Sequence, residues 1–268
     1  MAAERAKPLP RSTVIKLASV LGLEDDAFIV GGQALNLWAE RYAPGRQDLI
    51  AFGPFTSKDI DYYGHRAAAQ KLADALGGKV HLPGPDDHTP NSAVVSASID
   101  GINVEIDFLS DVAGVKVNAL ERDAVELIVP VRGGSGIDEL AIPVMHPLHC
   151  LQSRIANVVT LGRSYEVALR QLAAAPIVLE AYVDEMLGRG EVREATVTLK
   201  RLFDYLRTDI AARACPDLPM RDPVEIFATF QRDPRLDWRF RWFNLRSMRR
   251  TLAAKRRRKA GGRGPSAI

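Results

Sequence analysis

Apolar residues near the N-terminus recur first at helical and then at strand spacing. In "RSTVIKLASVLGL" (11–23) they return every three or four residues, which predicts a helix with Ser12 as its N-cap. The short apolar run "AFIV" then stops at Gly31 and Gly32, and apolar residues resume at helical spacing after them. This pattern predicts a strand, a glycine turn and a helix that begins near Gln33.

Two aspartates lie one residue apart in the next predicted strand, "KDIDYYG" (58–64). Because successive side chains of a strand point to opposite faces, Ile60 and Tyr62 share one face while Asp59 and Asp61 share the other. Tyr62 has two interpretations, stacking on a base or packing in the core. The core interpretation is favoured.

The remaining segments of the first half continue the mixed pattern. "RAAAQKLADALGG" is alanine-rich, amphipathic and closed by two glycines, which predicts a helix. "SAVVSASI" and "INVEIDFLS" flank Asp100-Gly101, a dipeptide typical of tight hairpins, and predict two antiparallel strands. "VELIVPV" and "LAIPVM" predict further strands, whereas "APGRQDLIAFGPF" predicts a loop or irregular insertion.

From about His146 the pattern is helical, and Pro176 is expected to kink or divide the second long segment. The change near Met145 predicts an α+β protein in two domains. A small mixed β-sheet core with flanking helices is expected over residues 1–145, and an α-helical domain over 146–259. Residues 260–268 are expected to form a disordered tail.

The composition is that of a globular protein. Hydrophobic residues make up 47% and charged residues 26% of 268 residues, and no apolar run is long enough to cross a bilayer. The N-terminal segment lacks the apolar core of a secretion signal, so a cytoplasmic location and no membrane partner are expected. Cys150 and Cys215 lack metal or redox spacing and are interpreted as core thiols.

The charge is distributed unevenly along the chain. From Trp238 onward there are eleven Lys or Arg and no Asp or Glu, while the preceding residues hold 25 basic against 33 acidic groups. A basic extension on an acidic body favours a polyanionic partner, and a solvated tail that binds nothing is the alternative.

The same segment has apolar residues at spacings of three and four, which predict a stripe that docks on the helical domain: Trp238, Trp242, Leu245, Met248 and Leu252. The basic residues between and after them, including "KRRRK" (255–259), would then face outward. Five of these are candidate contacts to the phosphates of RNA: Arg246, Arg249, Arg250, Arg256 and Arg257.

Two histidines, His146 and His149, lie three residues apart at the start of a predicted helix. They could share a metal ion, or they could cap and pack that helix. Because no third histidine or suitable carboxylate lies nearby in the sequence, capping and packing are favoured.

The aspartates have a chemical interpretation. Two carboxylates on one strand face repel each other unless a cation or solvent lies between them. Oxygen ligands on a short strand suit Mg²⁺, with Mn²⁺ as the alternative cation. If the strand with Asp107 lies beside the first strand, a third carboxylate joins Asp59 and Asp61, and Glu105 is its neighbour on that face. Three carboxylates can hold two such ions.

The glycines suit a phosphate ligand. Without side chains, Gly31 and Gly32 let a triphosphate approach the backbone, and the helix that starts near Gln33 directs free N–H groups toward the anion. The sequence therefore predicts a metal–triphosphate site between the glycine turn and the aspartates.

The order of these motifs resembles the nucleotidyltransferase superfamily with the DNA polymerase β-like fold. Within it, the chain is similar to the toxin-type branch related to AbiEii and the MenT toxins. The resemblance covers about residues 27 to 110, with a weaker similarity in "HPLHCLQSRIANVVTLGR". Its matching residues are Gly31, Gly32, Ala34, "TSKDID" (56–61) and "VEIDFLS" (104–110).

The resemblance implies an enzyme that moves a nucleoside monophosphate from an NTP to an acceptor hydroxyl, with Mg²⁺ as cofactor. It implies metal binding by Asp59 and Asp61 and a role for Asp107 in deprotonating the acceptor. RNA, such as a tRNA 3′ end, is the first expected acceptor, and an antitoxin protein is an expected partner. A small molecule or a protein remains an alternative acceptor, and a non-catalytic nucleotide- or nucleic-acid-binding module remains an alternative function.

By the same resemblance, five residues are expected to bind the nucleotide: Gly31, Gly32, Gln33, Ser57 and Arg154. The chain departs from the family pattern at three points. Gln33 and Ala34 stand where many members have a serine, the separation between Gly32 and Asp59 is longer than usual, and Arg154 stands where a lysine is common.

Overall fold

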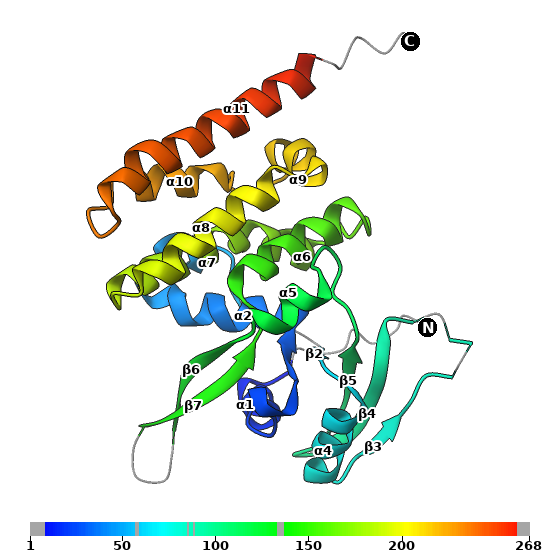
Figure 1. Ribbon diagram of the computed structural model, residues 1–268. Coiled ribbons are helices and arrows are strands. Elements are labelled where there is room, and N and C mark those ends of the chain that lie inside the picture. The colour runs from blue at the N-terminus through cyan, green and yellow to red at the C-terminus, as the bar shows by residue number, and fades with distance from the viewer. Residues whose placement is uncertain (1–8, 57–58, 85, 88, 133–136, 262–268) are drawn as a thin grey trace. The chain divides into compact units, whose positions relative to one another are not determined.

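The computed structural model describes residues 9–56, 59–84, 86–87, 89–132 and 137–261. Two compact units make up the chain, residues 1–153 and 154–268, here called the sheet unit and the helical unit (Figure 1). The division falls inside helix α6 (Pro147–Val159), later in the chain than the composition change at Met145. The protein thus has the mixed α and β structure that the sequence predicts.

Within the described residues, seven strands form one mixed sheet in the order β3-β4-β5-β2-β1-β7-β6. Strand β1 pairs antiparallel with β2 and parallel with β7, and β2 pairs parallel with β5. The strands are β1 (Phe28–Val30), β2 (Ile60–Tyr63), β3 (Lys79–His81), β4 (Asn91–Ile99), β5 (Ile102–Leu109), β6 (Val125–Arg132) and β7 (Ile137–Val144).

The helices of the sheet unit are α1 (Arg11–Ala18), α2 (Gly31–Tyr42), α3 (Gln47–Ile50), α4 (Arg66–Leu76) and α5 (Val117–Arg122), with 3₁₀ turns at 23–25 and 43–45. Helix α4 ends at Gly77, whose φ of +62° places it in the left-handed region that caps many helices. The predicted alanine-rich helix is confirmed.

Burial in β2 follows the predicted alternation from Ile60 to Tyr62, but Tyr63, on the face of Asp61, is buried as well. Ile60 and Tyr62 are fully buried. The ring of Tyr62 stacks on Phe108 with ring centroids 5.3 Å apart, and its hydroxyl donates a hydrogen bond to the carbonyl of Leu17 at 3.1 Å. The core interpretation of Tyr62 is confirmed, and Asp61 lies on the opposite face of the strand together with Tyr63.

The β4–β5 hairpin forms where Asp100-Gly101 predicts it. Both residues have positive φ, 51° and 79°. Two positive values in a two-residue loop match the twist of the flanking strands. The predicted antiparallel pair is confirmed, and the strands predicted from "VELIVPV" and "LAIPVM" are β6 and β7.

Two helix starts and one loop differ from the prediction. Helix α1 begins at Arg11 after Pro10, so Ser12 as its N-cap is wrong. Helix α2 begins directly after β1, at Gly31 rather than near Gln33. The segment predicted as a loop holds the short helix α3, which places Leu49 in the core. Burial of Leu49 orders this segment, and such a tertiary contact leaves little local signal.

The helical unit contains the end of α6 and then α7 (Glu166–Gly188), α8 (Val192–Leu206), α9 (Asp209–Ala214), α10 (Val224–Gln231) and α11 (Arg246–Gly261). Helix α7 continues through Pro176, so the expectation that this proline divides the helix is wrong. Most residues around Pro176 are buried, and their packing outweighs the loss of one backbone hydrogen bond.

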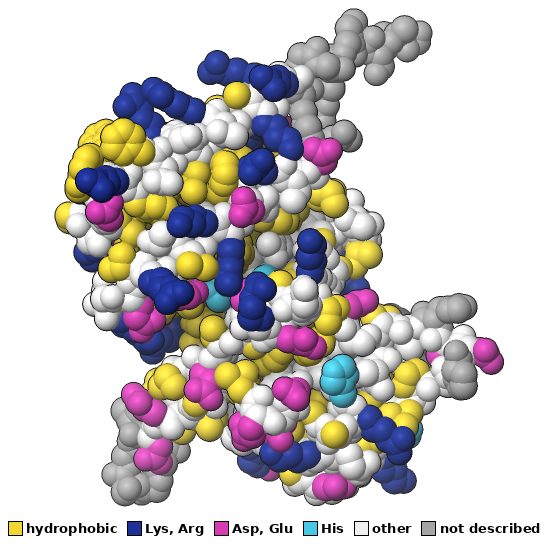
Figure 2. All heavy atoms as spheres, viewed as in Figure 1, with side chains coloured by type: hydrophobic (Ala, Val, Ile, Leu, Met, Phe, Trp, Pro, Cys, Tyr) yellow, Lys and Arg dark blue, Asp and Glu magenta, His cyan; other side chains and the backbone are white. Residues whose placement is uncertain are grey.

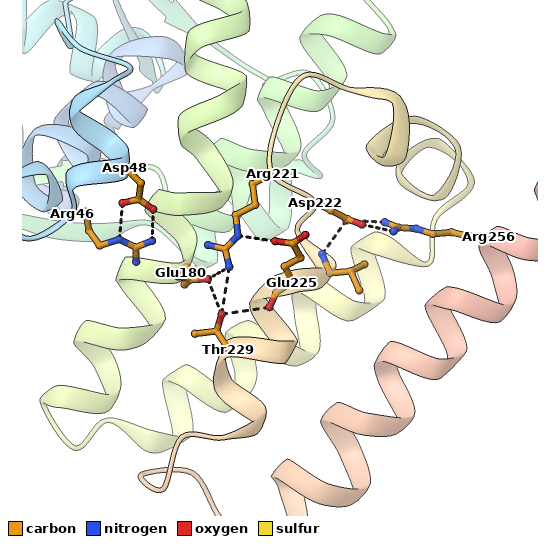
Figure 3. A network of polar contacts seen from close by, with 9 residues as sticks. Arg46, Asp48, Glu180, Arg221, Asp222, Glu225, Thr229 and Arg256 are labelled. Carbon is orange, nitrogen blue, oxygen red and sulfur yellow. Dashed lines mark hydrogen bonds and ion pairs between the residues drawn. The ribbon is translucent and has the colours of Figure 1, made fainter.

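Ion pairs connect the helices of this unit (Figure 3). Arg221 contacts Glu180 of α7 at 2.7 Å and Glu225 of α10 at 3.1 Å. Arg256 of α11 donates from Nη2 to Asp222 Oδ1 at 2.9 Å. Arg256 was a candidate RNA contact, yet its guanidinium is engaged in holding α11 to the segment before α10.

The segment before α11 is a π-helical turn over Phe240–Leu245. The predicted apolar stripe is confirmed for three residues, which are buried: Leu245, Met248 and Leu252. It is wrong for Trp238 and Trp242, which are 53% and 52% exposed. A π turn holds more residues than an α turn, so it rotates the residues before it away from the buried stripe.

Three smaller expectations can be compared with the structure. Cys150 and Cys215 are buried free thiols, as predicted. His146 caps its helix by accepting a hydrogen bond from the N–H of Leu148 at 3.0 Å, and His149 lies between Asp123 and Gln152. In the part of the chain that the structure describes, no helix has both the length and the apolar character needed to cross a membrane.

Candidate active site

Asp61 and Asp107 lie side by side in the centre of the sheet. Strands β2 and β5 run parallel, and Asp61 is paired with Asp107 in their register. Paired residues on neighbouring strands point to the same face, about 4.8 Å apart along the hydrogen-bonding direction. The third carboxylate therefore joins the face of the first pair, although 45 residues lie between Asp61 and Asp107 in the chain.

The charge environment of Asp107 shows that more than two carboxylates meet here. Burial raises the pKa of Asp107 above its usual value, and the negative charges of Asp59 and Glu105 raise it further. The side-chain amide of Asn91 opposes these effects by donating to Asp107 Oδ1 at 2.9 Å. Asp59, which directly precedes β2, is thus close enough to repel Asp107.

We expect Asp107→Asn to stabilise the metal-free protein at neutral pH. The pKa of Asp107 in the folded state lies above the value of about 3.9 in unfolded chains. Protonation of Asp107 therefore stabilises the folded state fully below about pH 4. This stabilisation is lost as the pH rises through the pKa of Asp107 in the folded state. Asparagine stays neutral, so the variant should unfold at a higher temperature than the wild type at pH 7. Thermal unfolding in EDTA measures this.

The difference between the two proteins should vanish near pH 3, where Asp107 is protonated in both states. Asp111→Asn, at an exposed position just after β5, is the matched control and should leave the unfolding temperature almost unchanged. A lower unfolding temperature for Asp107→Asn at pH 7 would contradict the repulsion described here.

Gly31 brings the start of α2 against Asp61. Its φ is +68°, and a Cβ added to it would lie 2.5 Å from Asp61 Oδ2. No L-residue fits there without displacing the carboxylate, because real Cβ atoms do not approach other atoms so closely. The glycine turn and the aspartate strand meet because β1 and β2 are antiparallel, with Val30 paired to Asp61. The first turn of α2, with its free N–H groups, therefore lies beside the carboxylates.

A cleft of about 230 Å³ opens on the sheet unit along α2. Gln33 from the first turn of α2 and Thr56, shortly before Asp59, line it together with the apolar side chains of Val14, Leu37 and Phe55. Gln33 is 5% exposed, and among the described residues nothing forms a hydrogen bond with its Oε1. A buried acceptor in this state costs free energy unless a ligand or water satisfies it.

The carboxylates of this site are donors of the kind that Mg²⁺ binds. In the described part of the chain, no three His, Cys, Asp or Glu side chains form a ready metal-binding group. Mg²⁺ does not need one, because it commonly binds one or two carboxylates and completes its shell with water and substrate phosphates. Adjacent oxygen donors at Asp61 and Asp107, with Asp59 nearby, fit this ion.

The remaining residues predicted to bind nucleotide or RNA lie in α2, in the helical unit or outside the described residues. Gly32 follows Gly31 in the first turn of α2, and Ser57 lies outside the described residues. Arg154 is 7% exposed and donates from Nη1 to Gln171 Oε1 on α7 at 2.8 Å, both within the helical unit. Of the candidate RNA contacts, Arg249 donates to Gln231 Oε1 at 2.8 Å. Three others are exposed on α11: Arg246, Arg250 and Arg257.

Asn91 is the site residue that the sequence did not reveal. The register of a two-residue hairpin at Asp100-Gly101 places Val94 opposite Asp107, with Asn91 too far along β4 to suggest a contact. An irregularity between Asn91 and Ala93 shifts the pairing, and Asn91 then reaches Asp107. Bulges of this kind commonly re-aim a side chain and have no clear sequence signal here.

No protein-family model, curated protein or solved structure matches the chain.

Proposed function

We propose that the protein is a Mg²⁺-dependent nucleotidyltransferase that transfers a nucleoside monophosphate from an NTP to an acceptor hydroxyl. The observation that carries the proposal is the pairing of Asp61 with Asp107, with Gly31 packed against Asp61. It combines a carboxylate cluster for a cation with a helix start suited to phosphates.

In the proposed reaction, the oxygen of the acceptor hydroxyl attacks the α-phosphorus of the NTP. A new O–P bond forms, the bond from the α-phosphorus to the bridging oxygen breaks, and pyrophosphate leaves. Asp107 receives the proton of the hydroxyl, and the N–H groups at the start of α2 hold the triphosphate near Gly31 and Gly32.

Asp59, Asp61 and Asp107 are the residues that would hold Mg²⁺, which supplies positive charge to the triphosphate when bound. The cation also explains why carboxylates that repel each other stand together. A bound cation would offset the repulsion from Asp59 and Glu105, which adds to burial in raising the pKa of Asp107.

Gln33 is proposed to contact the nucleotide from the cleft beside α2. Its buried Oε1 can accept a hydrogen bond from an N–H or O–H group of the ligand. Ser57 and Arg154 stay proposed phosphate contacts by the resemblance alone.

RNA is the proposed acceptor, with a tRNA end as the first candidate. The excess of basic residues after Trp238 supports a polyanionic acceptor. A small-molecule or protein hydroxyl is the alternative acceptor, and an antitoxin protein is a proposed partner by the toxin-type resemblance.

A non-catalytic module that binds nucleotide or nucleic acid is the rival from another class. The carboxylates argue against it, because three anions beside a phosphate site weaken phosphate binding unless a cation joins them. A module that only binds nucleotide or nucleic acid gives no reason for repelling carboxylates to stand together at Asp107.

Label transfer separates the two proposals. Wild type and Asp59→Ala are incubated with each labelled NTP, Mg²⁺ and total RNA, and in parallel with small-molecule and protein acceptors. Transfer by the wild type alone supports the enzyme. Absence of transfer to every acceptor, with nucleotide binding retained, supports the binding module.

A further inference from the structure

Three large aromatic side chains are exposed at the start of the last helix. Trp238, Trp242 and Phe243 are 53%, 52% and 64% exposed, and we call them the aromatic platform. The rings of Trp238 and Phe243 lie with their centroids 5.9 Å apart. Large aromatic side chains exposed together on one short segment are a feature of binding sites.

The π-helical turn produces the platform. Phe240 and Leu245, five residues apart, both point into the helical unit and are buried. This spacing matches a π turn, and it leaves the platform residues on the outside. Asp237 fixes the start of the helix by accepting hydrogen bonds from the N–H groups of Arg239 and Phe240 at 2.8 and 3.1 Å. The platform is therefore held on an ordered helix rather than on a loose loop.

Positive charge surrounds the platform. The guanidinium carbon of Arg239 lies 5.5 Å from the centre of the Trp238 ring, and Arg246 is exposed on the first turn of α11. Figure 2 shows Lys and Arg side chains on the surface of the α11 region, next to exposed hydrophobic ones. The carboxylate of Asp233 is paired with Arg235, whereas that of Asp237, next to Trp238, accepts hydrogen bonds from backbone N–H groups.

We propose that the aromatic platform binds single-stranded RNA, whose bases stack on Trp238, Trp242 and Phe243 while Arg239 and Arg246 contact its phosphates. Aromatic rings combined with a basic surface are how proteins bind single strands with little sequence preference. The idea that the platform holds the RNA acceptor rests on the proposed function. Binding of RNA to the platform does not itself need the carboxylates of the sheet unit.

Single-stranded RNA fits better than duplex RNA or a lipid surface. In a duplex the bases are stacked on one another, so their faces cannot reach the rings. A helix that lies on a membrane inserts a continuous apolar face, whereas the apolar face of α11 is buried within the helical unit at Leu245, Met248 and Leu252.

Binding is measured on the full chain carrying Asp61→Asn, in EDTA and without NTP, so that catalysis plays no part. The probe is a short labelled single-stranded RNA of mixed sequence, followed by anisotropy and by tryptophan emission. The chain has three tryptophans, and Trp38 is only 3% exposed, so a change in emission reports on Trp238 and Trp242. We expect RNA to quench this emission.

The variant Trp238→Ala with Trp242→Ala should weaken binding of the single strand by about tenfold or more for each ring lost. Tyr165→Ala, at an aromatic residue that is 59% exposed elsewhere in the helical unit, is the matched control and should bind like its parent. Circular dichroism confirms that each variant is folded.

Three results would overturn the platform: unchanged affinity of the double variant, duplex RNA bound as tightly as the single strand, or emission changes produced by anionic vesicles but not by RNA. Failure of the transferase proposal gives a different result from failure of the platform proposal. Wild type would then transfer no label, while the platform still binds the single strand in both wild type and Asp61→Asn.

Discussion

Asp61→Asn should abolish nucleotidyl transfer, lowering kcat/KM by about 10³-fold or more. Asp61 is next to Asp107 in register and against Gly31, so it is the carboxylate that would hold the proposed cation beside the helix start. Loss of a charge that binds a catalytic cation removes several kcal/mol of transition-state stabilisation, and each 1.36 kcal/mol is about tenfold in rate. Label transfer from NTP to RNA, measured at saturating Mg²⁺, gives the ratio.

The control is Glu105→Gln, which removes a carboxylate from the same strand as Asp107 but two residues before it. Glu105 is exposed and has no assigned part in cation binding, so this variant should keep most of the activity. The Asp61→Asn protein should remain folded, since asparagine has the same shape. Activity within tenfold of wild type in Asp61→Asn would falsify the assignment of Asp61.

The second large effect is expected from Gly31→Ala. The left-handed φ costs an alanine about 1–2 kcal/mol, and the new Cβ would meet Asp61 Oδ2 at 2.5 Å. The carboxylate must then move away from its position beside Asp107. We expect transfer to fall by about 100-fold or more, since displacement of a catalytic group by a fraction of an ångström to one ångström has effects of this size. Steady-state label transfer and thermal unfolding measure both consequences.

Gly77→Ala separates strain from displacement. Gly77 has a nearly equal φ of +62°, yet a Cβ there meets nothing within 4 Å. This variant should lose a similar amount of stability from strain and keep its transferase activity. If Gly31→Ala and Gly77→Ala have the same activity, the contact between Gly31 and Asp61 plays no part in the reaction.

Much of the candidate site could be predicted because its signals are local. The alternation in "KDIDYYG" placed Asp59 and Asp61 opposite buried Ile60 and Tyr62, as the structure shows for Asp61. The glycine turn after "AFIV" and the Asp100-Gly101 hairpin could be predicted from the sequence in the same way. Each depends on the backbone geometry of a few adjacent residues, which sequence spacing and glycine placement report directly.

The pairing of β2 with β5 could not be read in this way. Helix α4 and strands β3 and β4 lie between them in the chain, and the sequence offers several other strands as neighbours of β2. Which strand becomes the neighbour depends on how all apolar faces pack together, a property of the whole sheet. The contact of Asn91 with Asp107 depends in addition on a local shift in register.

The sequence by itself determined most of the longer helices and strands, though not the short elements α3, β3 and α5, and it showed which residues carry carboxylate and basic chemistry. The tertiary structure decided that Asp107 stands beside Asp61, that Gly31 is packed against that carboxylate, and that a π turn exposes Trp238 and Trp242. The physical reason is range: periodic patterns encode local geometry, whereas strand neighbours and the phase of a helix are set by packing between residues distant in sequence.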